Sequence, residues 1–266
     1  MKSILNKLRA ILRRDLLTAI RHRTGFVMSA VGLLMELAAF YFLARAIGPG
    51  FRPGGVEYFP FLLVGTGVYT FFVMSTQAFL STVQEAQQTG TMEVLMTTST
   101  PPAQLVVLSS VSAFAGNLGK MVVYLAAGAA IFSAPFHANF LSCITVMMFC
   151  VAIALAVGIG AATIQITFQK GSAVLWLLSS GVWFLSGAMF PIESLPRPLV
   201  MVAHAIPLSY AIGGMRMALL QEQPVLAMAP TLAVLLAFSA VLLPLALWGL
   251  SSSLRRARKD GTLSFY

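Results

Sequence analysis

Six apolar stretches, each long enough to cross a bilayer, occupy most of this chain of 266 residues. A membrane-spanning helix needs about 20 mostly apolar residues in succession. The pattern therefore predicts an all-α polytopic membrane protein whose six-helix transmembrane domain covers residues 25–250. We expect the six spans at residues 26–47, 58–83, 106–133, 140–168, 173–190 and 228–250.

The composition and the placement of charge agree with this fold. Only 9% of the residues are charged, against about 25% in a soluble domain. The net charge of +9 invites a nucleic-acid interpretation, but the basic residues gather on one side of the expected membrane, as in cytoplasmic loops. We therefore expect both termini in the cytoplasm and no nucleic-acid partner. Twelve basic residues lie on that side: Lys2, Lys7, Arg9, Arg13, Arg14, Arg21, Arg23, Lys170, Arg255, Arg256, Arg258 and Lys259. The other side carries Arg45, Arg52, Arg197 and Arg216.

Both ends of the chain are basic. Residues 1–24 follow a helical period, with apolar residues on one side and Lys and Arg on the other. Such a helix is expected to lie at the membrane interface, with its basic face toward anionic headgroups or a partner protein. Residues 251–266 are expected to form a basic cytoplasmic tail.

A polar insert at residues 84–105 separates the second and third apolar stretches. It carries Glu85 and Glu93 but no Lys or Arg, although the charge count places it in the cytoplasm. Gly90 permits a bend, and Pro101 and Pro102 end one element and start the next. The short helix predicted between them has an apolar face that suits a groove in a partner protein. That face consists of Met92, Val94, Leu95 and Met96.

A second unusual segment, residues 191–224, follows the fifth apolar stretch. It is too apolar for an exposed loop, and its prolines prevent a continuous span. We expect two short re-entrant helices that dip into the outer leaflet, where irregular backbone must be covered by protein or line a cavity.

Two charged residues lie deep inside expected spans, far from the span ends. Glu36 and Lys120 are hypothesised to form an ion pair that fixes the packing of the first and third spans, since intramembrane charges usually pair or face a cavity. The alternative is that either residue contacts a substrate or a proton.

Polar and aromatic residues also lie along the second and fifth expected spans, 58–83 and 173–190. Stripes of this kind suit a path for a substrate with an apolar tail and a polar head, although they also mark helix packing and interfacial anchoring. The candidate path residues are Gln77, Trp176, Ser180 and Trp183.

Enzyme chemistry has little support in this sequence. None of His22, His137 and His204 has a companion at the spacing of a metal ligand or a nucleophile. The run Gly116-Asn117-Leu118-Gly119-Lys120 lacks the first glycine and the final Ser or Thr of a phosphate-binding loop. We expect no catalytic residues, no metal site and no cofactor in this chain, so any energy source must lie elsewhere.

Several segments resemble one known family. Residues 89–98, Thr-Gly-Thr-Met-Glu-Val-Leu-Met-Thr-Thr, resemble the G-T-L-E-x-L-L-x-T-P stretch of the type-2 ABC exporter permeases. Residues 184–196 resemble the segment that follows their fifth span, and residues 206–211 resemble their N-P-L-T-Y-A pattern. Residues 255–263 are similar to the closing segment of bacterial members, so the likeness covers nearly the whole chain.

This resemblance implies a transport subunit rather than an enzyme. It implies a dimer of permeases in the bacterial cytoplasmic (inner) membrane, bound to two cytoplasmic ATPase subunits that hold ATP and Mg²⁺. We expect a homodimer, although the sequence does not distinguish it from a heterodimer. By this resemblance, the insert corresponds to the family's coupling helix, which sits in a groove of the ATPase. Residues 1–24 correspond to the connecting helix beside it. The residues carried over to the coupling element are Glu85, Gly90, Thr91, Met92 and Glu93.

The sequence thus predicts the permease of an exporter for an amphipathic lipid, a glycolipid or a hydrophobic drug. One alternative is an ABC-type complex that transmits force or regulates membrane proteins without translocation. Another is a stand-alone secondary transporter driven by an ion gradient.

Overall fold

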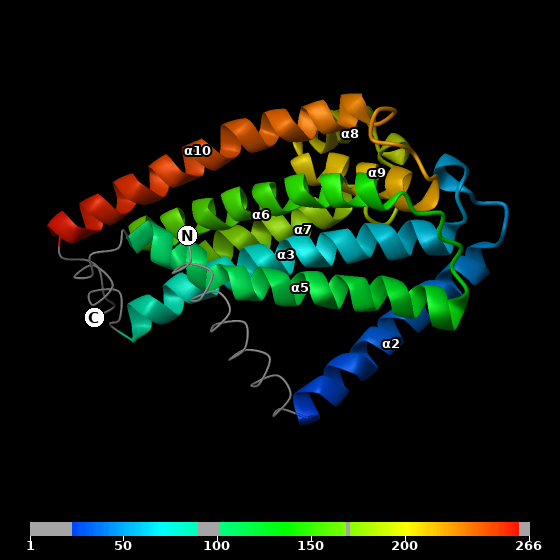
Figure 1. Ribbon diagram of the computed structural model, residues 1–266, viewed down its shortest axis with the longest axis horizontal. Coiled ribbons are helices and arrows are strands. Elements are labelled where there is room, and N and C mark those ends of the chain that lie inside the picture. The colour runs from blue at the N-terminus through cyan, green and yellow to red at the C-terminus, as the bar shows by residue number, and fades with distance from the viewer. Residues whose placement is uncertain (1–22, 90–101, 169–170, 261–266) are drawn as a thin grey trace.

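The computed structural model describes residues 23–89, 102–168 and 171–260, and within these ranges the chain is a bundle of helices without strands. Long helices run along the bundle, and a group of short ones covers one end of it (Figure 1). The long helices are α2 (Arg23–Ile47), α3 (Tyr58–Gln88), α5 (Pro102–Phe132), α6 (Phe140–Phe168), α7 (Gly171–Leu185) and α10 (Ala229–Asp260).

The membrane character of the fold follows from the length and apolarity of these helices. Among the described residues, five of them, α2, α3, α5, α6 and α10, are long and apolar enough to cross a bilayer. The all-α polytopic membrane fold is therefore confirmed. The fifth predicted span corresponds to α7, which has 15 residues and is shorter than the roughly 20 that a full crossing requires. A count of six crossings therefore stays a prediction.

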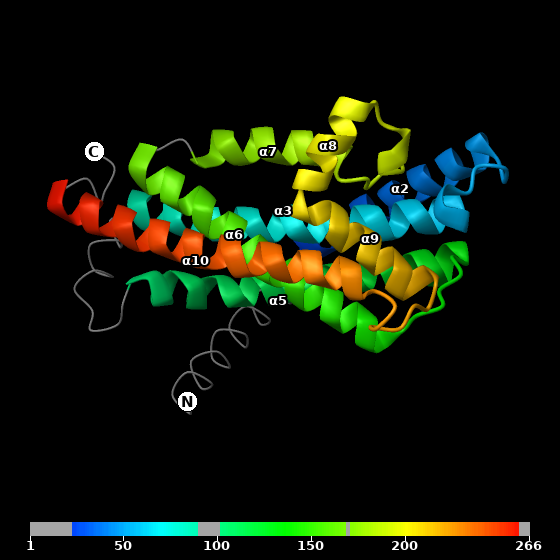
Figure 2. The same cartoon turned by 90° about the horizontal axis from the view of Figure 1, so that it is seen from above.

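Helix α3 forms the centre of the bundle. In its most apolar window 78% of the residues are buried, whereas the corresponding share is 6% in α2 and 17% in α10. Helices α5, α6, α7 and α9 (Pro207–Leu220) pack around it, as both views show (Figures 1 and 2). Phe71 and Phe79 of α3 are almost fully buried, so burial of apolar surface anchors this helix at the centre of the bundle.

The segment after α7 is broken into short helices. It contains η2 (Ile192–Ser194), α8 (Arg197–Ala205) and α9, and the axes of α8 and α9 differ by 85°. Both α8 and α9 carry a proline in the first turn. A backbone N–H at this position has no acceptor within the helix, so the missing N–H of proline costs no helical hydrogen bond. The two short helices predicted here are present, and their insertion into the outer leaflet stays a prediction. We call the end of the bundle that holds α8 and α9 the hairpin end, and the opposite end, where α3 leads toward the insert, the insert end.

Some helix boundaries differ from those expected. Helix α3 continues to Gln88 instead of ending at residue 83, and α10 continues to Asp260, so the first ten residues of the expected tail are helical. Helix α7 ends at Leu185 instead of residue 190. Gly187, with φ of +75°, turns the chain just beyond it. Nearly all of the predicted N-terminal helix, insert residues 90–101 and tail residues 261–266 lie outside the described residues.

Candidate functional site

Helix α3 ends at the insert end in a defined hydrogen-bonded turn. The Glu85 carbonyl oxygen accepts the backbone N–H of Thr89 at 2.9 Å and the Thr89 hydroxyl at 2.7 Å. The Glu85 side chain is exposed, as a contact with another protein requires. The other predicted coupling residues, Gly90, Thr91, Met92 and Glu93, lie outside the described residues.

A cluster of three glutamine side chains, the amide cluster, joins α3 to α6 at this end. Gln84 Nε2 donates to Gln165 Oε1, and Gln165 Nε2 donates to Gln87 Oε1, both at 3.4 Å. Gln87 and Gln165 are each only 2% exposed. Because a buried amide without partners is costly, this mutual bonding fixes the last turns of α3 against α6.

The apolar surroundings of the amide cluster bring in α10. Val83 of α3, Ile166 of α6 and Leu254 of α10 belong to one buried cluster. The hydroxyls of Thr167 and Ser253 lie 2.8 Å apart and add a polar contact between α6 and α10. Three helices are therefore held together next to the start of the insert.

At the hairpin end, Arg216 of α9 forms the most extensive polar contact described in the chain. Its Nη1 donates to the Gly187 carbonyl and its Nη2 to the Ala188 carbonyl, each at 2.8 Å. Nε and Nη2 both donate to the Phe61 carbonyl, at 3.2 and 3.0 Å. Tyr58 adds a hydrogen bond from its hydroxyl to the Met189 carbonyl at 3.1 Å. These contacts, the Arg216 cluster, join α9, the start of α3 and the turn after α7.

The Arg216 cluster supplies donors to backbone carbonyls that lie outside any helix. Gly187 and Ala188 lie beyond the end of α7 at Leu185, and a guanidinium with five N–H donors bonds to both carbonyls. Gly65 makes the arrangement possible, because a Cβ at this position would collide with the Arg216 guanidinium and the Ala188 carbonyl.

The two intramembrane charges do not form an ion pair in this structure. Glu36 of α2 and Lys120 of α5 are both exposed, and no ion pair joins these two described residues. One turn beyond Lys120, the hydroxyl of Tyr124 is buried without a hydrogen-bond partner. The hypothesis that Glu36 and Lys120 pair within the membrane stays a prediction.

The candidate path residues are spread over the outer faces of α3 and α7. Gln77 is exposed, and Trp176 is 72% exposed. Ser180 donates its hydroxyl to the Trp176 carbonyl at 2.9 Å, and the half-buried Trp183 packs edge-on against Phe184 at 5.0 Å. No hydrogen bond joins Gln77 to these α7 residues, all of which are described, and the polar contact between the two helices instead runs from the hydroxyl of Tyr69 to the carbonyl of Ser179 at 3.1 Å. Their role in a path stays a prediction.

The sequence interpretation missed Arg216 and Gln165 as structural centres. Each is an isolated, strongly polar residue in an apolar segment, and that isolation was the available signal. Arg216 counted only toward the charge balance. Among the described residues, no three His, Cys, Asp or Glu side chains gather into a group that could hold a metal ion.

Comparison with known proteins identifies the family. A search among curated proteins gave no match. A family model described as ABC-2 type transporter matches residues 6–220, which include the insert, the amide cluster and the Arg216 cluster. The matched region covers well over half of the chain, so the chain belongs to the ABC-2 type transporter family.

Proposed function

We propose that this chain, a multi-pass ABC transporter permease, works in an ATP-driven exporter for an amphipathic lipid, a glycolipid or a hydrophobic drug. Two copies of the chain bind two cytoplasmic ATPase subunits, which hold the ATP and Mg²⁺. The complex resides in a bacterial cytoplasmic membrane with both termini of the chain in the cytoplasm. The chain itself contributes no catalytic group.

The observation that carries the proposal is the fixation of α3 at both ends. This helix has 31 residues, or about 46 Å at 1.5 Å per residue. The Arg216 cluster holds its first turns and the amide cluster holds its last turns. A push on the insert is therefore delivered to the central helix of the bundle instead of being absorbed by a loose connection.

ATP binding would use this connection to switch the permease between two packings. Closure of the two ATPase subunits would bring the two inserts together and tilt α2, α3 and α7 as rigid bodies around a path between the two copies. The ATPase shifts the equilibrium because it binds the two permease conformations with different affinity. The exposed Gln77, Trp176 and Ser180 combine polar groups with an aromatic face, which suits an amphipathic cargo.

A pull-down from gently solubilised membranes tests the partnership. Wild type should recover an ATP-binding subunit, and Glu93→Arg should recover much less of it, because the substitution reverses a charge on the coupling insert. Glu222→Arg is the matched control, since Glu222 is exposed beyond α9 and far from the insert in sequence. Absence of an ATPase from every sample would refute the proposal and favour a secondary transporter.

Reconstituted complexes then separate transport from force transmission. An exporter should show ATPase activity that its cargo stimulates, together with accumulation of that cargo on the far side of the membrane. ATP hydrolysis that responds to no amphiphile would instead support a complex that transmits force without translocation.

A further inference from the structure

A cavity of about 450 Å³ opens at the hairpin end, between the end of α2, the start of α3 and the connection from α5 to α6. Its floor is aromatic. The rings of Tyr41 and Phe132 lie 4.9 Å apart, and Phe59 packs against them at 5.5 and 5.7 Å between ring centres. Three helices each contribute one ring, so the floor is a packed part of the fold and not the result of one side-chain rotamer.

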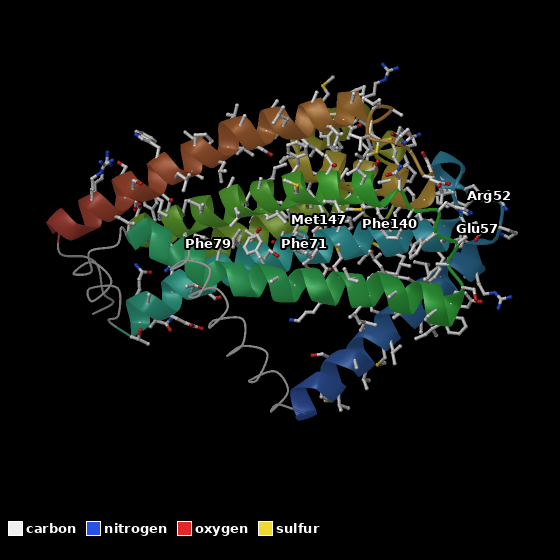
Figure 3. All side chains as sticks on the ribbon, in the orientation of Figure 1. Arg52, Glu57, Phe71, Phe79, Phe140 and Met147 are labelled. Carbon is white, nitrogen blue, oxygen red and sulfur yellow. The ribbon has the colours of Figure 1, made fainter. Side chains whose placement is uncertain are left out.

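The rim of this cavity carries two arginines and one glutamate. Arg45, Arg52 and Glu57 line the cavity and are exposed, and Arg52 and Glu57 lie together at this end of the molecule (Figure 3). The guanidinium of Arg45 lies 5.8 Å from the centre of the Tyr41 ring. Arg52 uses Nε in a long 3.4 Å bond to the Pro49 carbonyl, and no hydrogen bond within the described chain uses its two Nη groups.

The charges on the rim do not neutralise one another by direct contact. No ion pair joins Glu57 to either arginine, all three being described residues. The rim has a formal charge of +1, which matches the single negative charge of a phosphodiester. Guanidinium groups bind phosphate oxygens in a bidentate manner, and the aromatic floor offers an apolar surface beside them.

We propose that this cavity binds the phosphate-bearing headgroup of a lipid in the outer leaflet, with the upper part of its chains against Tyr41, Phe59 and Phe132. The cavity lies where α2 and α5 end and α3 begins, and the ends of spanning helices are where tyrosine and tryptophan rings lie at the headgroup level. The assignment to the outer leaflet rests on the proposed topology. Binding itself requires neither an ATPase nor transport, so it can fail or succeed independently of the proposed function.

The test measures lipid binding to the purified full chain in detergent by native mass spectrometry. The probe is dioctanoyl phosphatidylglycerol, and dioctanoylglycerol is the analogue without phosphate. The double variant Arg45→Gln/Arg52→Gln should weaken binding of the probe by at least about tenfold, since both charge-assisted donors are lost. The matched control, Arg197→Gln/Arg255→Gln, removes two exposed arginines outside the cavity and should bind as wild type does.

A second variant moves binding in the opposite direction. Glu57→Gln removes the negative charge on the rim and should tighten binding of phosphatidylglycerol several-fold, a gain that a misfolded protein would not produce. Size-exclusion chromatography and thermal unfolding in the same detergent verify that each variant is folded.

Four results with the lipid probes would overturn the proposal, and a fifth comes from competition with phosphate. The four are absence of the probe from wild type, equally tight binding of dioctanoylglycerol, an unchanged affinity in the Arg45→Gln/Arg52→Gln variant, and an equal loss in the control variant. Inorganic phosphate serves as a competitor. If millimolar phosphate displaces the lipid from wild type as effectively as unlabelled phosphatidylglycerol does, the cavity is a site for free anions and the lipid assignment is wrong.

Discussion

The guanidinium carbon of Arg216 lies 3.3 Å from the centre of the Phe61 ring, while Nε and Nη2 of the same side chain donate to the Phe61 carbonyl. One residue of α3 is thus held through both its side chain and its backbone. The remaining bonds of the guanidinium go to Gly187 and Ala188. A charged guanidinium packed between helices is tolerated only with good hydrogen bonds. We therefore expect α9, the start of α3 and the turn after α7 to move as one body.

Replacement of Arg216 by methionine should destabilise the fold strongly. The change removes the guanidinium donors of Gly187 and Ala188, whose carbonyls lie outside any helix, and an unsatisfied buried polar group costs about 1–3 kcal/mol. We expect the free energy of unfolding to fall by about 3 kcal/mol, and Arg216→Lys to recover only part of this because lysine lacks the planar fork. Thermal unfolding in detergent measures both variants. Equal stability of lysine and arginine at this position would contradict the assigned geometry.

Gly65→Ala tests the close approach on which the Arg216 cluster depends. The added methyl group collides with the guanidinium and with the backbone of Ala188, and overpacking of this kind costs about 1–3 kcal/mol. Gly213→Ala, in the same helix as Arg216, is the matched control, because a Cβ there meets no atom within 4 Å. It should be neutral or stabilising by up to about 1 kcal/mol. A comparison of unfolding temperatures checks the pair, and a neutral Gly65→Ala would show that α3 and the turn after α7 can separate.

The sequence was sufficient to locate the long helices, because apolar runs of membrane length have few alternatives to a helix. It was less informative about where the helices end. The polar character of residues 84–88, four of which are Gln or Glu, predicts that they belong to the insert. In the structure Gln87 is buried and the helix continues through it. Residues 251–260 contain no helix-breaking residue, so α10 extends past its apolar part to Asp260.

The Arg216 cluster and the amide cluster could not be predicted from the sequence, for a different reason. Hydropathy identifies Arg216 as an anomaly, but its acceptors are carbonyls of Phe61, Gly187 and Ala188. A backbone carbonyl is present at every residue, so nothing in the sequence marks these three. The partners of Gln165 are two glutamines about 80 positions away. Only the packing of α3 against α6 identifies them among the polar residues of the chain.

Gln165→Met should lower stability by about 2 kcal/mol, because Gln84 and Gln87 each lose a partner in a region that is largely buried. The double variant Gln165→Met/Gln87→Met should recover part of that loss. Replacement of both buried amides by apolar side chains of similar shape removes the unsatisfied group itself. Thermal unfolding of the two single variants and the double variant measures the effect. A strictly additive loss would contradict the view that the two amides depend on each other.

The predicted pair of Glu36 and Lys120 calls for a double-mutant cycle. Both side chains are exposed on the isolated chain, and an unpaired charge in the middle of a membrane helix costs about 2.5–3.5 kcal/mol on insertion scales. The four-carbon stem of lysine is flexible, and the pairing hypothesis requires that it reorient toward Glu36 in the membrane. Glu36→Gln and Lys120→Met should each reduce the amount of folded protein recovered from membranes.

Their combination should restore most of that amount, because it removes both charges together. Expressed as unfolding free energies, the coupling between the two sites should reach at least about 1 kcal/mol, within the range of residues in direct contact. Losses that simply add would mean that Glu36 and Lys120 act separately. In that case each charge must face water or a ligand of its own, and the α2 and α5 faces that carry them would belong to the transport path.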